Sequence, residues 1–398
     1  MASTATPPPP TPLSFPRPIF AALTPHPFLH AHLSASKQKQ PLRANGRTAH
    51  ESRQLGVNTG SLTHCNGSAV VRVGNTAVVC GVRAEILTAE EGTVDEFPAS
   101  SNTNGGDEDE DEEENGYRNG AEDERERYKE ISALRLLVPN VELCTGSTPA
   151  LLPGNAPSAF AQTLVTRIRN LLLSTKVVGA RQLRIVHAGP DASLGGDTGG
   201  PNPNREGDEV MREGGEGEGE MEIHERLVKG YWTLYIDTMF ISLDGNALDA
   251  AWLAILSALS DTRLPHAYFD DELEMILCSD DAARAKKLEL AGLPVPSTFA
   301  VFESDGRWGE DDDGDGEGEG EGKSWVLSDP DTFEESVCQE SITVVVDCST
   351  STKAQIRKIE KSGGGVVDRE VMKMLVKRSL ERWKEWKKTL STNSRAFF

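Results

Sequence analysis

The chain has 398 residues and a formal charge of −22, from 63 Asp and Glu against 41 Lys and Arg. This length allows one large or two ordinary domains with a substantial core, and so acidic an average would normally argue against nucleic acid as a partner. No stretch approaches the run of about 18 apolar residues that crossing a bilayer requires, so no membrane partner is expected.

Most of the acid is concentrated in three glycine-rich stretches. Residues 90–126 carry 16 acids and 2 bases, residues 191–225 carry 11 and 2, and residues 303–323 carry 10 and 2. Runs such as GEGEGEG bury too little apolar surface to offset their ordering entropy, so we predict three disordered inserts. The rest of the chain carries a formal charge of +9. The part that folds is therefore basic, and it is compatible with a phosphate backbone as partner.

The first 50 residues contain no acid, which resembles an organelle transit peptide. However, a PPPP run and the prolines at 16, 18, 25 and 27 disfavour the amphipathic helix of such a peptide. We therefore predict a disordered, proline-rich tail at 1–26, and we assign 391–398 as the C-terminal tail. The six cysteines form no CxxC and no zinc-ligand spacing, so we expect no metal, no cofactor and a reducing compartment.

In chain order, residues 61–87 read as two β-runs joined by Gly74 and Asn75, which predicts a hairpin. Residues 131–139 predict a third strand, so that the first acidic insert lies between two strands of one sheet. Residues 156–173 place apolar side chains at helical spacing and predict a helix. A short strand at 182–187 and a long one at 231–243 then precede a helix at 246–259.

Beyond Pro265 the pattern partly repeats, with apolar runs at 273–278, 298–302, 324–327 and 341–348 and a helix from about 368. The last helix combines lysines with Trp383 and Trp386. These tryptophans indicate either a nucleic-acid-binding face or packing against the body, and packing is favoured. We predict an α+β architecture of two β-sheet/helix subdomains, 27–264 and 265–390.

Four motifs resemble the RNase PH-like ring subunits of the eukaryotic RNA exosome. They are RANGRTAHESR at 43–53, GSAVVRVGNTAVVCGVRAEI at 67–86, LDGNALDAAWLAILSALSDTRLP at 243–265 and SDPDTFEES at 328–336. The resemblance runs from about 40 to 390 without the inserts. It implies the RNase PH fold, which is ribosomal protein S5 domain 2-like. It also implies partnership with other ring subunits, cap subunits, RNA and an associated nuclease, in the nucleus, nucleolus and cytoplasm.

The same resemblance implies that active relatives carry two aspartates five residues apart, which act at the bond that phosphate attacks. In this chain the second falls on Asp244 and the first on Met239. A thioether neither donates that proton nor binds magnesium, which takes oxygen ligands. The relatives' Thr-Arg pair for phosphate is replaced by Ala247 and Leu248. We therefore expect a non-catalytic member, in which Asp244 ties its turn and caps the following helix.

Candidate RNA contacts are the basic residues of the matched motifs and of the helix at 156–173. They are Arg43, Arg47, Arg53, Arg83, Arg167 and Arg169. Solvated surface positions are the alternative for Arg43, Arg47 and Arg53, and ion pairs with a neighbouring subunit are the alternative for Arg167 and Arg169. Two other functions stay open. One is an active phosphorolytic exonuclease that uses Asp237 or Asp249, and the other is a free-standing RNA-binding protein.

Overall fold

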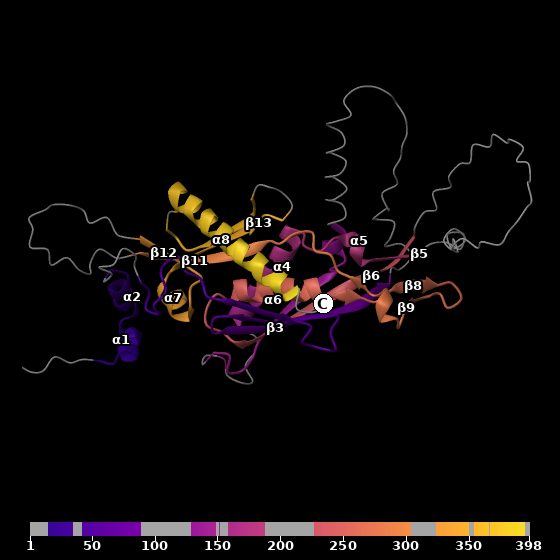
Figure 1. The fold of residues 1–398 in the computed structure, drawn as a ribbon, viewed down its shortest axis with the longest axis horizontal. Coiled ribbons are helices and arrows are strands. Elements are labelled where there is room, and N and C mark those ends of the chain that lie inside the picture. Colours follow the sequence, from indigo (N-terminus) through magenta and orange to yellow (C-terminus); the bar gives the residue numbers. More distant parts are fainter. Residues whose placement is uncertain are drawn as a thin grey trace, which may run out of the picture.

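The computed structural model describes residues 15–34, 42–88, 129–148, 151, 158–187, 227–303, 324–349, 354–365 and 367–394. Apart from Glu303, the predicted inserts at 90–126, 191–225 and 303–323 lie outside these ranges. Two sheets dominate the described part, and long helices pack on and between them (Figure 1).

The larger sheet has six strands in the order β1-β2-β3-β6-β4, with β5 also on β6. The strands are β1 (Leu55–Thr59), β2 (Gly67–Val73), β3 (Thr76–Thr88), β4 (Leu137–Leu143), β5 (Arg184–His187) and β6 (Leu227–Ser242). The hairpin expected at Gly74 and Asn75 is confirmed as the β2–β3 turn. β3 and β4 both pair with β6, so the first insert does connect two strands of one sheet.

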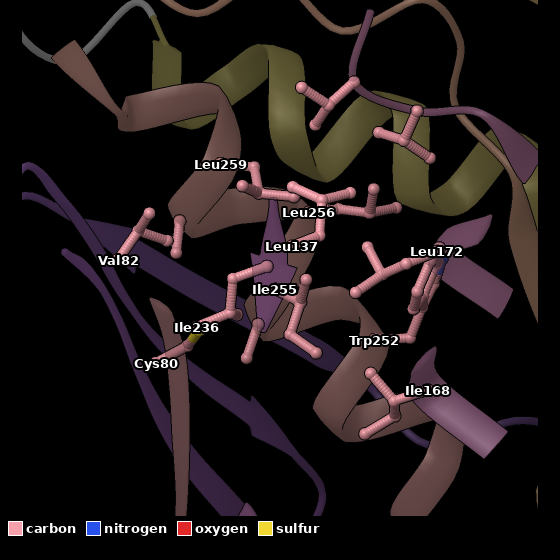
Figure 2. Packing of buried hydrophobic residues seen from close by; sticks show 14 of the residues in the cluster. Cys80, Val82, Leu137, Ile168, Leu172, Ile236, Trp252, Ile255, Leu256 and Leu259 are labelled. Carbon is pink, nitrogen blue, oxygen red and sulfur yellow. The ribbon is translucent and has the colours of Figure 1, made fainter. Parts of the chain in front are cut away.

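Helices α4 (Ala159–Thr175) and α6 (Ala247–Asp261) cover the inner face of this sheet, and the short α5 (Ala180–Leu183) leads into β5. From Ala247 to Leu259 every residue of α6 is buried, because the helix packs on β2 and β3 and also on β11 of the second sheet. Its alanines allow this close approach. Figure 2 shows Trp252 and Ile255 of α6 among side chains from α4, β3, β4 and β6.

The second sheet has the strand order β12-β11-β13-β14, and every pair is antiparallel. Its strands are β11 (Val295–Glu303), β12 (Ser324–Ser328), β13 (Glu340–Asp347) and β14 (Gln355–Ser362), accompanied by α7 (Thr332–Val337) and the long α8 (Arg369–Ser394). Smaller elements join the sheets: β7 (Arg263–Leu264), β8 (Ala267–Asp270), β9 (Met275–Cys278), η2 (Ala282–Arg284) and β10 (Lys286–Lys287). α8 runs diagonally across the molecule and contacts both sheets (Figure 1).

The prediction of a disordered tail is wrong for residues 17–26, which form α1 (Arg17–Leu23) and the start of α2 (Pro25–Ser34). Prolines are tolerated in a helix's first turn, where the missing N–H has no helical partner. Leu29 and Leu33 of α2 are buried beside Phe302 and Leu327, so packing on the second sheet holds the segment. The predicted tail at 391–398 is likewise helical as far as Ser394.

The strand predicted at 131–139 begins only at Leu137. Residues 129–133 form a helical turn, and Arg135 then reverses the chain with φ of 52°. The turn is anchored because Glu130 is buried and accepts hydrogen bonds from Arg184, with a shortest separation of 2.7 Å. This ion pair with a residue more than fifty positions away overrides the local β-pattern.

Candidate functional site

The turn between β6 and α6 carries the Asp-Gly-Asn motif. A Cβ on Gly245, whose φ is 69°, would lie 2.4 Å from the backbone of Asp331, so only glycine fits. The carboxylate of Asp244 accepts hydrogen bonds from Asn75 at 3.0 Å and from the Thr332 backbone N–H at 3.5 Å. The expectation that Asp244 ties its turn is thus confirmed. The N-cap of α6, however, is Asn246, so the predicted capping role of Asp244 is wrong.

Met239 lies on the outer face of β6, two residues after Asp237. Both side chains are exposed, whereas Ile236, Thr238 and Phe240 alternate with them and point into the core. The only hydrogen bond that the described residues give the Asp237 carboxylate comes from Asn140, at 3.3 Å. The position that matches the relatives' first aspartate therefore faces solvent and presents a thioether.

Asp249 occupies the opposite side of this region, inside α6. Its carboxylate is buried and accepts bonds from Asn246 Nδ2 at 2.8 Å and from the backbone N–H and the hydroxyl of Thr298 at 3.0 and 2.9 Å. With these acceptor positions occupied, Asp249 links α6 to β11. Of the two alternative acids, only Asp237 faces solvent.

A cleft of about 230 Å³ opens beside the first turn of α6. It is lined by Phe160, Thr163, Leu164, Arg167, Asn246, Ala247, Leu248, Thr298, Ala300, Pro330, Glu335, Cys338, Gln339, Glu340 and Ser341. Arg167 is the one cation among these residues, and Glu360 holds its guanidinium at 3.0 Å. The Asn246 backbone N–H at the helix start donates to the Glu335 carboxyl at 2.8 Å.

This cleft is poorly suited to phosphate. A site for phosphate needs cations and free N–H groups directed at the anion. Here Ala247 and Leu248 bring no charge, and Glu335 and Glu340 add carboxyls to the wall. The pocket that the family resemblance associates with phosphate is thus lined by apolar and acidic residues, and its one cation, Arg167, is paired with Glu360.

The arginines of the N-terminal motif are internal structural residues. Arg53 donates two side-chain hydrogen bonds to Asp329, from Nη2 to Oδ1 at 2.7 Å and from Nε to Oδ2 at 2.9 Å. Arg43 is buried and donates to Glu334 at 3.2 Å and to the Ala49 carbonyl at 2.9 Å. This corrects the expectation that Arg43 and Arg53 contact RNA, because their donors are directed inward.

Arg47 belongs to the same cluster but is less deeply buried. Its guanidinium lies 3.6 Å from Glu334, 3.8 Å from Asp329 and 3.9 Å from Asp331. Together the three arginines fasten the segment 43–53 to the loop before α7. These partners are nearly 300 residues away in sequence. The sequence signal that could have indicated them is the set of acids in SDPDTFEES.

The buried Asp329 is the centre of this cluster. Burial alone would raise its pKa, but the hydrogen bonds and charge of Arg53 outweigh that effect and hold the pKa well below its usual range. Asn246 Nδ2 also donates to Asp329 at 2.7 Å and to Asp249, so the cluster reaches the start of α6. The N-terminal motif, the β6–α6 turn and the Asp-Pro loop are therefore one hydrogen-bonded unit.

The remaining candidate RNA contacts lie on β3 and α4. Arg83 is exposed on the outer face of the large sheet, 5.6 Å from the Tyr235 ring centroid and 3.2 Å from Glu85. Arg167 lines the cleft, whereas Arg169 is exposed on α4. RNA binding by these three residues stays a prediction.

The two tryptophans of α8 are buried, as the favoured interpretation predicts. Trp383 donates its indole N–H to the Leu293 carbonyl at 2.8 Å, and Trp386 is 1% exposed within the main core. Within the described ranges, no group of three or more His, Cys, Asp or Glu side chains is arranged to hold a metal ion. No helix there is long and apolar enough to cross a membrane.

Comparison with known proteins shows what this chain is similar to. Residues 51–143 and 209–265 match the model of the 3′ exoribonuclease family, domain 1. The exosome complex component rrp43 of Schizosaccharomyces pombe is 24% identical over 93% of this chain and 94% of its own length. An exosome component Rrp42 of Thermococcus gammatolerans is 22% identical over 88% and 90%.

Solved structures agree on the fold. A chain of the Archaeoglobus fulgidus exosome with RNA bound to the active site superposes with a TM-score of 0.55, at 17% identity, over 93% of this chain and 98% of that one. The segment LCTGSTPALLPGNAPSAFAQTL and the motif order predict a likeness to ribosomal RNA-processing protein 43, which the fission yeast relative confirms. Residues 51–143 and 209–265 are thus similar to domain 1 of the 3′ exoribonuclease family, and the chain has the RNase PH fold.

Proposed function

We propose that this chain is a catalytically silent ring subunit of the RNA exosome. It would assemble with other RNase PH-like ring subunits and with cap subunits, guide RNA, and leave 3′-to-5′ processing and degradation to an associated nuclease. The relatives that support this are named as exosome components and match the chain over nearly its whole length. Nucleus, nucleolus and cytoplasm are the compartments that this role implies.

The single observation that carries the catalytic silence is the chemistry around the β6–α6 turn. Met239 stands where the resemblance puts an acid, and Asp244 is engaged with Asn75 and the start of α7. At the start of α6 the adjacent cleft has the uncharged Ala247 and Leu248, and its one cation, Arg167, is paired with Glu360. Without placed charge, neither the attacking phosphate nor the leaving 3′ oxygen would be stabilised in the transition state.

Catalytic silence is tested with the purified full chain, 3′-hydroxyl RNA, magnesium and inorganic phosphate. We expect release of nucleoside diphosphates at the level of a protein-free control. A phosphorolytically active exosome ring of archaeal type, assayed in parallel, verifies the reagents. Sustained, enzyme-dependent release would refute the proposal.

The Asp237 carboxylate supports the best remaining enzymatic alternative, because it is exposed on the same strand face as Met239. If the chain were active through it, D237N would abolish the release and D280N, a change at another exposed aspartate, would not. We expect neither variant to differ from the inactive parent.

A further inference from the structure

The outer face of α8 carries a row of lysines that the proposed function leaves unexplained. At about 100° of rotation per residue, Lys373, Lys377, Lys384 and Lys388 fall within an arc of about 60°. All four are exposed. We call these four residues the lysine stripe.

The buried side of α8 lies opposite the stripe. Leu375, Ser379, Trp383 and Trp386 face the sheets. The helix's central arginines also point inward: Arg378 donates to the Val326 carbonyl at 2.9 Å and Arg382 to the Arg53 carbonyl at 3.1 Å. Arg378, Arg382 and both tryptophans therefore face the protein interior, whereas the stripe lysines face solvent.

The lysine stripe is more positively charged than α8 as a whole. The acids of α8 are Glu370, Glu381 and Glu385, and the same rotation places them along one flank of the stripe. Glu370 pairs with Lys373 at 2.7 Å and Glu385 pairs with the inward Arg382 at 2.8 Å. In the part of the chain that the structure describes, no salt bridge engages Lys377 or Lys384.

We propose that the lysine stripe binds the phosphate backbone of single-stranded RNA. Lysines four residues apart are separated by about 6 Å along the helix axis, and the whole stripe spans about 22 Å. Such a row of point charges can follow successive phosphates of an extended strand. Because Trp383 and Trp386 are buried, the aromatic residues within α8 offer no ring to stack on bases. The binding is therefore independent of base sequence.

RNA fits this surface better than a membrane or an acidic protein does. The exposed arc carries no Trp or Phe that would anchor it in lipid. A folded protein partner usually needs buried aromatic or arginine side chains at the centre of its interface, and here those are turned inward. This inference adds an RNA contact to the proposed ring subunit. The lysine stripe belongs to this chain alone, so its binding to RNA can be tested without the other subunits.

The test measures binding of the full chain to a fluorescein-labelled oligouridylate by anisotropy over a range of salt concentrations. In one variant all four stripe lysines become glutamine. In a matched control with the same loss of charge, the exposed residues Lys129, Arg284, Lys286 and Lys287 become glutamine. Thermal unfolding of all three proteins shows that the fold is retained.

We expect the stripe variant to bind at least about tenfold more weakly near 0.1 M salt, and its log K against log salt slope to become shallower by about 3. The control should stay close to the parent, and oligoadenylate should bind like oligouridylate. Equal loss in both variants, no loss in the stripe variant, or a parent that binds anionic vesicles or polyglutamate but no RNA would overturn the inference. Co-purification of the stripe variant with ring subunits tests assembly separately, so the two proposals can fail independently.

Discussion

Asp329 shows how a single residue connects segments far apart in the chain. It is 4% exposed and accepts bonds from Arg53 and Asn246, which belong to the N-terminal motif and to the start of α6. A buried ion pair is not by itself strongly stabilising, because both charges are desolvated. Removing one member is costly, since the other charge is then left buried without compensation.

We therefore expect D329N to lower the free energy of unfolding by about 3–5 kcal/mol. Urea denaturation measures the effect, and D280N, at an exposed aspartate, serves as the control with an expected change within about 0.5 kcal/mol. A loss equal to that of the control would contradict the bridging role of Asp329.

Acid should lower the stability of the parent chain and of D329N to different extents. The pKa of Asp329 is depressed in the folded state, so its contribution is fully present above the unfolded value of about 4 and is lost as pH falls below it. Stability of the parent should decline more steeply below about pH 5 than that of D329N. Parallel pH profiles would show that Asp329 is not the group responsible.

At the scale of elements, α8 holds the two sheets together. It contacts β1 of the large sheet and β11 and β13 of the second, and Trp386 lies in the main core. Replacing Trp386 with alanine should cost about 3–5 kcal/mol of unfolding free energy, because a large cavity forms between the sheets. The exposed Glu381→Ala on the same helix should stay near the parent. Urea denaturation gives both values, and a small loss in W386A would mean that α8 is dispensable for the core.

Sequence patterns predicted these elements where local chemistry and tertiary packing agree. The β2–β3 hairpin follows from a Gly-Asn turn between alternating strands, and α6 from its apolar, alanine-rich run. Helix α2 was missed because it is stabilised by packing of Leu29 and Leu33 beside Phe302 and Leu327 rather than by propensity, and α1 was missed with it because it packs on α2. The roles of Arg43 and Arg53 were missed for a similar reason, since their partners lie almost 300 residues along the chain.

At the scale of the whole molecule, the same fold leaves one face of the large sheet open. Met239 and Ile241 are exposed there beside Asp237, whereas α4 and α6 cover the opposite face. A subunit of a closed ring is expected to present such surfaces to its neighbours. Apart from Glu303, the acidic inserts at 90–126, 191–225 and 303–323 lie outside the described residues. The proposed function is therefore that of a scaffold: the ionic cluster around Asp329 fixes the β6–α6 turn, and the function would depend on assembly.

The most direct test of that account is to purify the tagged full chain from its native cells under mild conditions and to identify its companions by size exclusion and mass spectrometry. The account predicts a complex of several hundred kilodaltons that contains other RNase PH-like ring subunits, cap subunits and a separate nuclease. A chain that elutes alone near its own mass of 43.1 kDa, with no such companions, would contradict it.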